Sequence, residues 1–120
     1  MSDKSYEEMV ADAKTRIREV RPADVIEMRQ RNEQVVLVDC REPNEWNLFH
    51  IPGAVHVPLG ELRDSIAELV TVDRDVIVYC ARGNRSALAA DAMQAIGYTN
   101  VRSMAEGIRG WVNAGGEVEQ

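Results

Sequence analysis

The chain has 120 residues, of which 45% are hydrophobic and 28% charged, and its formal net charge is −6. A chain of this length builds one domain of ordinary size and leaves no room for a second. The acidic balance argues against nucleic acid as the main partner, because phosphate binding needs a basic surface. No apolar run approaches the ~20 residues that span a bilayer, so we expect no membrane partner either.

The N-terminal segment is acidic and lacks the apolar core of a signal peptide, so we expect a cytoplasmic location. In that compartment, two cysteines suit catalysis or redox chemistry better than a disulfide framework. Between residues 5 and 20, apolar side chains recur at helical spacing. We therefore predict an accessory amphipathic helix in residues 1–20, packed over the sheet or making a dimer contact, followed by the main domain in residues 21–120.

Strand and helix patterns alternate through the main domain. Pro22 suits the first turn of a helix that ends near Asn32. A buried strand over 35–38, a polar loop over 39–53 and a short strand over 54–57 follow. The remaining predicted elements are a helix with Leu62, Ile66 and Leu69 facing inward, a strand over 76–79, a helix over 86–96 capped by Gly97, a strand over 100–103 and a helix over 108–113. This alternation predicts an α/β fold with a small parallel sheet and helices on both faces.

The run from Val76 to Ser86 takes an apolar strand to Cys80 and then a short glycine-containing loop into a helix. Backbone N–H groups of the loop and first helical turn converge on Cys80, and Arg82 and Arg85 add positive charge. Such surroundings lower a thiol pKa from its usual value of about 8.5, and the thiolate is the nucleophile. The alternative is a small buried structural cysteine. A thiol pointing inward and sealed from solvent would contradict the nucleophile.

This Cys-x-x-Gly-x-Arg-Ser run resembles the active-site loop of the rhodanese family of sulfurtransferases. Two further segments match the family in order, so the resemblance covers roughly residues 20 to 118. They are Val36-Leu37-Val38-Asp39-Cys40-Arg41-Glu42 with Glu45-Trp46 and His50-Ile51-Pro52-Gly53-Ala54, and Glu106-Gly107-Ile108-Arg109-Gly110-Trp111 with Ala114-Gly115-Gly116. Two positions depart from the pattern: Cys40 stands where an aliphatic residue is common, and Phe49 where a glycine is common.

The resemblance implies a rhodanese-like fold and a thiosulfate sulfurtransferase activity without a cofactor. Cys80 would take a sulfane sulfur from a small anionic donor, thiosulfate or a persulfide, and pass it to a thiol or cyanide acceptor; a thioredoxin-like protein is a candidate thiol. A partner-dedicated sulfur relay or a non-catalytic regulatory module is the alternative. Phosphatase or arsenate reductase is a minor one, because phosphatases of related fold use Cys-x5-Arg and this loop is Cys-x4-Arg.

The loop after Cys80 is the predicted anion cradle. Arg85 either fixes the loop shape or grips an anionic donor, and at a helix start it needs an anion nearby. Arg82 serves either donor recognition or solubility. The residues that we assign to substrate binding are Ala81, Arg82, Gly83, Asn84, Arg85 and Ser86.

Asp39 and Arg41 are expected to approach the loop as supporting residues. Their structural alternative is an internal ion pair with Glu42 or Glu45, which we favour for Asp39, whereas a contribution of Arg41 to the positive potential stays open. We expect no metal, because the spacing of Cys40, His50, His56 and Cys80 fits no compact ligand pattern. His50, Trp46, Met104 and Trp111 are interpreted as structural. Cys40 is interpreted as buried packing, or as a cysteine that resolves oxidised Cys80 through a disulfide.

Overall fold

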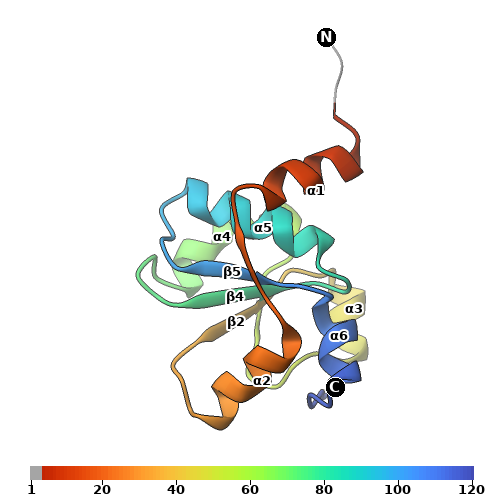
Figure 1. The fold of residues 1–120 in the computed structure, drawn as a ribbon. Coiled ribbons are helices and arrows are strands. Elements are labelled where there is room, and N and C mark those ends of the chain that lie inside the picture. Colours follow the sequence, from red (N-terminus) through yellow and green to blue (C-terminus); the bar gives the residue numbers. More distant parts are fainter. Residues whose placement is uncertain (1–3) are drawn as a thin grey trace.

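The computed structural model describes residues 4–120 and contains a five-stranded, fully parallel sheet with helices on both faces (Figure 1). The strand order is β1-β5-β4-β2-β3. This confirms the predicted α/β fold. In chain order the elements are α1 (Tyr6–Lys14), β1 (Arg18–Val20), α2 (Pro22–Gln30), β2 (Val36–Asp39), α3 (Pro43–Leu48), β3 (Val55–His56), a 3-10 helix (Leu59–Glu61), α4 (Leu62–Leu69), β4 (Val76–Tyr79), α5 (Asn84–Ala95), β5 (Val101–Met104) and α6 (Gly107–Asn113).

The core consists of two apolar layers, one on each face of the sheet. Alternate residues of a strand face opposite sides, so Val38 and Val78 pack toward α4 and α5, while Leu37 and Ile77 pack toward α2 and α6. All four residues of β4 are buried. Burial on both faces explains why the central strands are continuous apolar runs in the sequence.

The N-terminal helix is shorter than predicted. It ends at Lys14, and Arg18–Val20 form the edge strand β1, which pairs with β5. The helix predicted through residue 20 is therefore wrong in its last part, because a strand of three residues is too short to show a period of its own. The first three residues of that prediction lie outside the described range.

Helix α1 packs on α5 of the same domain. The Ser5 side chain accepts a hydrogen bond from the Glu8 backbone N–H and so caps the start of α1. Just beyond the end of α1, the Arg16 guanidinium makes two hydrogen bonds of 3.0 and 2.8 Å to the Asp91 carboxylate of α5. These contacts place α1 against α5, and a dimer contact stays a prediction.

Two other local predictions are wrong. The predicted polar loop over residues 39–53 contains helix α3, which begins at Pro43 in the position that proline favours. Leu69 is 57% exposed instead of facing inward, because the chain leaves α4 there and Val70 takes the buried position. Within residues 4–120, no helix combines the length and the apolar character needed to cross a bilayer.

Candidate active site

The loop after β4 wraps around the Cys80 sulfur. Gly83 adopts a φ of 97°, in the left-handed region that favours glycine, and this turn starts α5. The Gly83 N–H donates to Cys80 Sγ at 3.1 Å, and the Ser86 N–H does so at 3.4 Å. The Ser86 hydroxyl lies 3.5 Å from the same sulfur and 2.8 Å from Ser103 Oγ. Donors from the loop and the first helical turn thus converge on one atom.

Hydrogen bonding lowers the pKa of Cys80 to about 5. The largest cause is the neighbouring Cys40 thiol as a hydrogen-bond donor, and the Ser86 hydroxyl and N–H and the Arg82 backbone act in the same direction. Burial works against them, because it disfavours the charged form. Cys80 is therefore a thiolate at neutral pH, and hydrogen bonding, more than arginine charge, is the principal reason.

Cys80 is nevertheless covered. It is 1% exposed and belongs to the apolar cluster on the α4 and α5 side of the sheet. The expectation of a thiol that solvent can reach is wrong for this conformation, because the loop amides close over the sulfur as they bind it. The closed conformation thus meets the condition that contradicts a nucleophile, and a nucleophilic Cys80 requires the loop to open. A small molecule can meet Sγ only when the loop or its neighbours move.

The start of α6 fastens the loop from the other side. The Ile108 N–H donates to the Cys80 carbonyl at 2.8 Å and the Arg109 N–H to the Ala81 carbonyl at 3.2 Å. Gly107 has a φ of 58°, and a Cβ there would lie 2.5 Å from the Ala81 carbonyl carbon and oxygen. Only glycine fits this approach. This role of Gly107 was not predicted, although Gly107 stands in the C-terminal segment that resembles the family.

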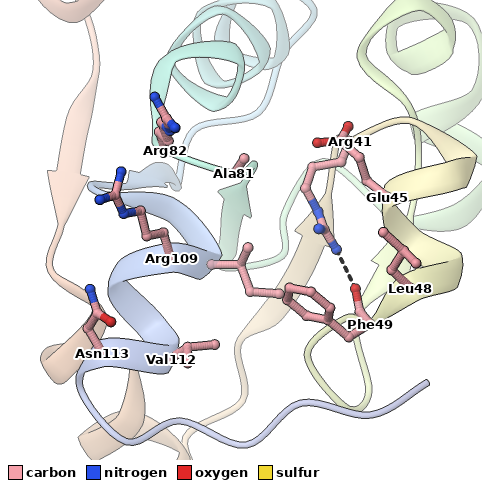
Figure 2. A pocket seen from close by; sticks show the side chains of 10 residues that line it. Arg41, Glu45, Leu48, Phe49, Ala81, Arg82, Arg109, Val112 and Asn113 are labelled. Carbon is pink, nitrogen blue, oxygen red and sulfur yellow. Dashed lines mark hydrogen bonds between the residues drawn. The ribbon is translucent and has the colours of Figure 1, made fainter.

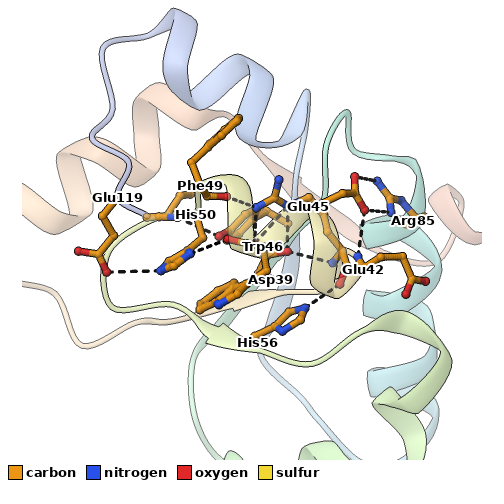
Figure 3. Close-up of polar contacts among 12 residues, drawn as sticks. Asp39, Glu42, Glu45, Trp46, Phe49, His50, His56, Arg85 and Glu119 are labelled. Carbon is orange, nitrogen blue, oxygen red and sulfur yellow. Dashed lines mark hydrogen bonds and ion pairs between the residues drawn. The ribbon is translucent and has the colours of Figure 1, made fainter.

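Arg85 is paired with Glu45 of α3. Its Nη1 and Nη2 donate to the two carboxylate oxygens at 2.6 and 2.9 Å (Figure 3). The hydrogen bonds from Arg85 are the largest cause that lowers the pKa of Glu45 to about 2. Glu45 is thus the anion that an arginine at a helix start requires. This geometry matches the loop-fixing role of Arg85 rather than the gripping of a donor.

Asp39 and Arg41 form a buried ion pair with each other. Arg41 Nη2 donates to Asp39 Oδ2 at 2.8 Å. It also donates to the Phe49 carbonyl at 2.7 Å (Figure 2). The expected partner, Glu42 or Glu45, is therefore wrong. The pair is local because the Arg41 N–H also donates to Asp39 Oδ1, which folds the chain back onto its own strand end. The carboxylate neutralises the guanidinium, which leaves Arg41 little free positive charge.

Aromatic stacking holds the chain between α3 and β3. The Trp46 ring stacks on His50 with centroids 3.6 Å apart and on His56 at 4.8 Å. His50 Nδ1 lies 2.9 Å from the Trp46 carbonyl, and its Nε2 lies 3.4 Å from a Glu119 carboxylate oxygen (Figure 3). Both histidines thus have structural partners. In residues 4–120, no three or more His, Cys, Asp and Glu side chains are grouped so that they could hold a metal ion.

A cavity of about 420 Å³ opens beside the loop, between α3 and α6 (Figure 2). Its walls are mostly apolar, and the exposed Arg82 and Arg109 lie along one side. Asn84 instead lines a smaller cavity against α1. Only three of the lining residues, Arg41, Ala81 and Arg82, were predicted as site residues. The apolar pair Leu48-Phe49 in a polar segment was a usable signal for the cavity. The full lining is Arg41, Glu45, Leu48, Phe49, Ala81, Arg82, Ile108, Arg109, Val112 and Asn113.

Fold and loop together define a class: an α/β protein that holds a thiolate in an amide-lined loop at the carboxyl end of a parallel strand. A family model for the rhodanese-like domain matches residues 21–114. The chain belongs to this family.

Known relatives include both enzymes and regulators. The HTH-type transcriptional regulator Rv0324 of Mycobacterium tuberculosis is 38% identical over 82% of this chain, and the chain spans 43% of that regulator's length. The thiosulfate:glutathione sulfurtransferase of Saccharomyces cerevisiae is 30% identical over 73% of the chain and 72% of its own length. A solved Rhodopseudomonas palustris protein, described as a possible tyrosine phosphatase, superposes with a TM-score of 0.88 at 30% identity, covering 99% of this chain and 97% of that one.

Proposed function

We propose that the protein is a sulfurtransferase that carries a sulfane sulfur on Cys80, from thiosulfate or a persulfide donor to a thiol or cyanide. The observation that carries the proposal is the Cys80 sulfur, which accepts the N–H groups of Gly83 and Ser86 and whose pKa is lowered to about 5. Membership of the rhodanese-like family and the yeast relative named for this reaction support it.

The reaction has two displacements. The Cys80 thiolate attacks the outer sulfur of thiosulfate, the sulfur–sulfur bond breaks, and sulfite leaves with the electron pair. A thiolate or cyanide then attacks the terminal sulfur of the Cys80 persulfide, and Cys80 leaves as a thiolate. A low thiol pKa serves both steps, because it populates the nucleophile and makes a good leaving group. The loop amides offset negative charge on the sulfur, and no general base is required.

The cavity beside the loop fits an organic reactant. Its volume of about 420 Å³ lies within the range of pockets that hold small organic ligands, about 300–1,000 Å³. The apolar side chains of Leu48, Phe49 and Val112 suit the carbon part of a thiol or persulfide, and Arg82 and Arg109 attract its anionic groups. Transfer also requires the loop to open, since Cys80 is covered at rest. A thioredoxin-like thiol remains a candidate acceptor under this proposal.

The test is thiocyanate formation from thiosulfate and cyanide by the purified protein. We expect turnover that Cys80→Ser abolishes, and, early in the reaction with thiosulfate, an intact mass one sulfur atom higher that returns with cyanide. If no small donor loads sulfur onto the protein, the enzyme proposal is wrong. A relay or regulatory module that serves a single partner then takes its place.

Phosphate-ester or arsenate chemistry is the minor alternative. The Cys-x4-Arg loop is one residue shorter than the phosphatase loop, and its arginine, Arg85, is already bound by Glu45. Hydrolysis of an aryl phosphate that is lost in Cys80→Ser would overturn our preference for sulfur transfer.

A further inference from the structure

The two cysteines of the chain lie side by side at the carboxyl edge of the sheet. Cys40 directly follows β2 and Cys80 directly follows β4, and the last residues of these strands, Asp39 and Tyr79, are register partners. The Cys40 N–H continues the ladder by donating to the Tyr79 carbonyl at 3.0 Å. Neighbouring strands lie about 4.8 Å apart, within the Cα separation of about 4.4–6.8 Å that a disulfide needs.

Both side chains also face the same layer of the core. Cys40 and Cys80 belong to one apolar cluster, together with Val38 and Val78 two residues earlier on each strand. Each cysteine is 1% exposed, and neither is in a disulfide. The pKa of the Cys40 thiol is raised, first by the neighbouring Cys80 as a hydrogen-bond partner and then by burial. The strand register and the shared cluster therefore bring the two cysteine side chains together at this sheet edge.

From this juxtaposition we propose that Cys40 is a resolving cysteine, which attacks the Cys80 persulfide, releases sulfide and leaves a Cys40–Cys80 disulfide. The inference rests on the proposed function, because the persulfide must form first. It assigns to the protein a second outcome of sulfur loading, reductive release of sulfide, alongside transfer to an external acceptor.

The step balances without an external oxidant. Cys40 Sγ attacks Cys80 Sγ, and a Cys40–Cys80 sulfur–sulfur bond forms while the bond from Cys80 to the terminal sulfur breaks. That terminal sulfur leaves with the electron pair and takes the Cys40 proton, so the product is hydrosulfide. The sulfane sulfur is reduced by two electrons, and the two cysteines are oxidised by two. A dithiol reductant then returns the pair to its free form by exchange.

Burial favours this internal route over a bulky external acceptor. Cys40 is already next to the sulfur that it attacks, so the step needs no bimolecular encounter. An external thiol must enter the closed loop to reach the same persulfide. The outcome therefore depends on whether an acceptor meets the open loop before Cys40 reacts.

The experiment loads the reduced full-length protein with thiosulfate without acceptor, and follows released sulfide and intact mass. We expect the wild-type protein to release up to one sulfide per chain and to end two hydrogens lighter than the reduced protein. Peptide mapping should find Cys40 joined to Cys80, and dithiothreitol should restore the starting mass. In Cys40→Val, which keeps an apolar side chain, sulfide release should be lost and the added sulfur retained. Cys40→Ser, which is closer in size to cysteine, should also lose sulfide release and retain the added sulfur. Melting curves verify that both variants fold.

Each outcome decides something. Wild-type protein that keeps the added sulfur, with no sulfide and no disulfide, overturns the role of Cys40 and leaves the proposed function standing. Sulfide release that is equal in wild-type and Cys40→Val also overturns it, since another route then discharges the persulfide. If the wild-type chain gains no sulfur and releases no sulfide, the proposed function fails, and this inference with it. The wild-type measurement decides even if neither variant folds.

Discussion

The segments after β4 and after β2 begin side by side, each with a cysteine, yet they are held in different ways. The loop after β4, residues 80–86, relies on backbone groups: N–H groups bind the Cys80 sulfur, and the start of α6 binds the loop carbonyls. The segment after β2, residues 40–50, relies on side chains in ion pairs and ring stacking. The comparison teaches that loop amides and the Cys40 and Ser86 side chains together make the reactive group, whereas Arg85, which resembles a substrate ligand, joins the two segments through Glu45.

The largest effect is expected from a change at Gly107, which disrupts the backbone contact between the start of α6 and the loop after β4. In Gly107→Ala the new Cβ would collide with the Ala81 carbonyl at a φ of 58°, so we expect sulfur transfer to be lost. The free energy of unfolding should fall by about 2–3 kcal/mol. Thiocyanate assays and urea unfolding measure both. Gly115→Ala is the matched control, because Gly115 also has a positive φ, 93°, but an added Cβ would meet nothing within 4 Å. Equal losses in the two variants would refute the contact explanation.

The second-largest effect tests whether Cys80 is a thiolate at neutral pH. Alkylation of Cys80 by iodoacetamide should be half-maximal near pH 5 and fall about tenfold between pH 7 and pH 4. Because the pKa is lower in the folded protein than in the unfolded chain, this group's stabilising contribution is full above about pH 8.5 and is lost as the pH falls toward 5. Mass spectrometry of the Cys80 peptide gives the rate.

Cys40→Val provides the control for that profile. The Cys40 thiol is the largest cause of the low pKa, so its removal should move the alkylation midpoint upward. A wild-type midpoint near the ordinary thiol value of about 8.5 would contradict the hydrogen-bonded thiolate.

A smaller effect is expected from a change at Glu45, which removes the ion pair with Arg85. Glu45→Gln keeps the shape but removes the charge that holds Arg85, and should cost about 1 kcal/mol of unfolding free energy and lower kcat a few-fold. The pKa of Glu45 is lowered to about 2. The ion pair therefore stabilises the fold above about pH 4.5, and this stabilisation is lost as the pH falls toward 2. Thermal melting across that range measures it.

Glu42→Gln is the matched control for Glu45. Glu42 is a neighbouring carboxylate at the start of the same helix, and within residues 4–120 it makes no ion pair. If Glu42→Gln costs as much stability and activity as Glu45→Gln, the Arg85 contact is not what joins the two segments.

The smallest effect concerns the exposed arginines beside the cavity. Arg82→Gln and Arg109→Gln should each raise the KM for thiosulfate about threefold with little change in kcat, because their exposed side chains attract an anion into the cavity. The difference should shrink at high salt. Arg74→Gln, just before the opposite end of β4, should leave KM unchanged. A fall in kcat without a change in KM would place these arginines in the chemical step instead.

Sequence alone was sufficient for the elements whose signal is local. The continuous apolar run of β4, the alanine-rich α5 and the left-handed Gly97 all lie where expected. Strand β1 was missed because its three residues are defined only by their partner β5, which comes much later in the chain. Helix α3 was missed because it is six residues long and none of them is buried.

The site residues also divide into those with a local sequence signal and those defined by distant partners. The glycine-containing turn and the amides on Cys80 could be predicted, because cysteine, glycine and helix start are adjacent in sequence. Three features depend on which elements become neighbours in space. They are the ion pair of Arg85 with Glu45, the hydrogen bonds from α6 to the loop carbonyls, and the burial of the Cys80 thiol. No spacing rule contains that information.

The pairing of β1 with β5 has a consequence for the order of folding. Arg18 stands opposite Arg102, so this edge of the sheet closes only when the first and last strands meet. Closing so long a loop carries an entropy cost that adjacent hairpins avoid, and such non-local contacts slow folding. During synthesis β1 therefore stays unpaired until β5, near the end of the domain, has left the ribosome.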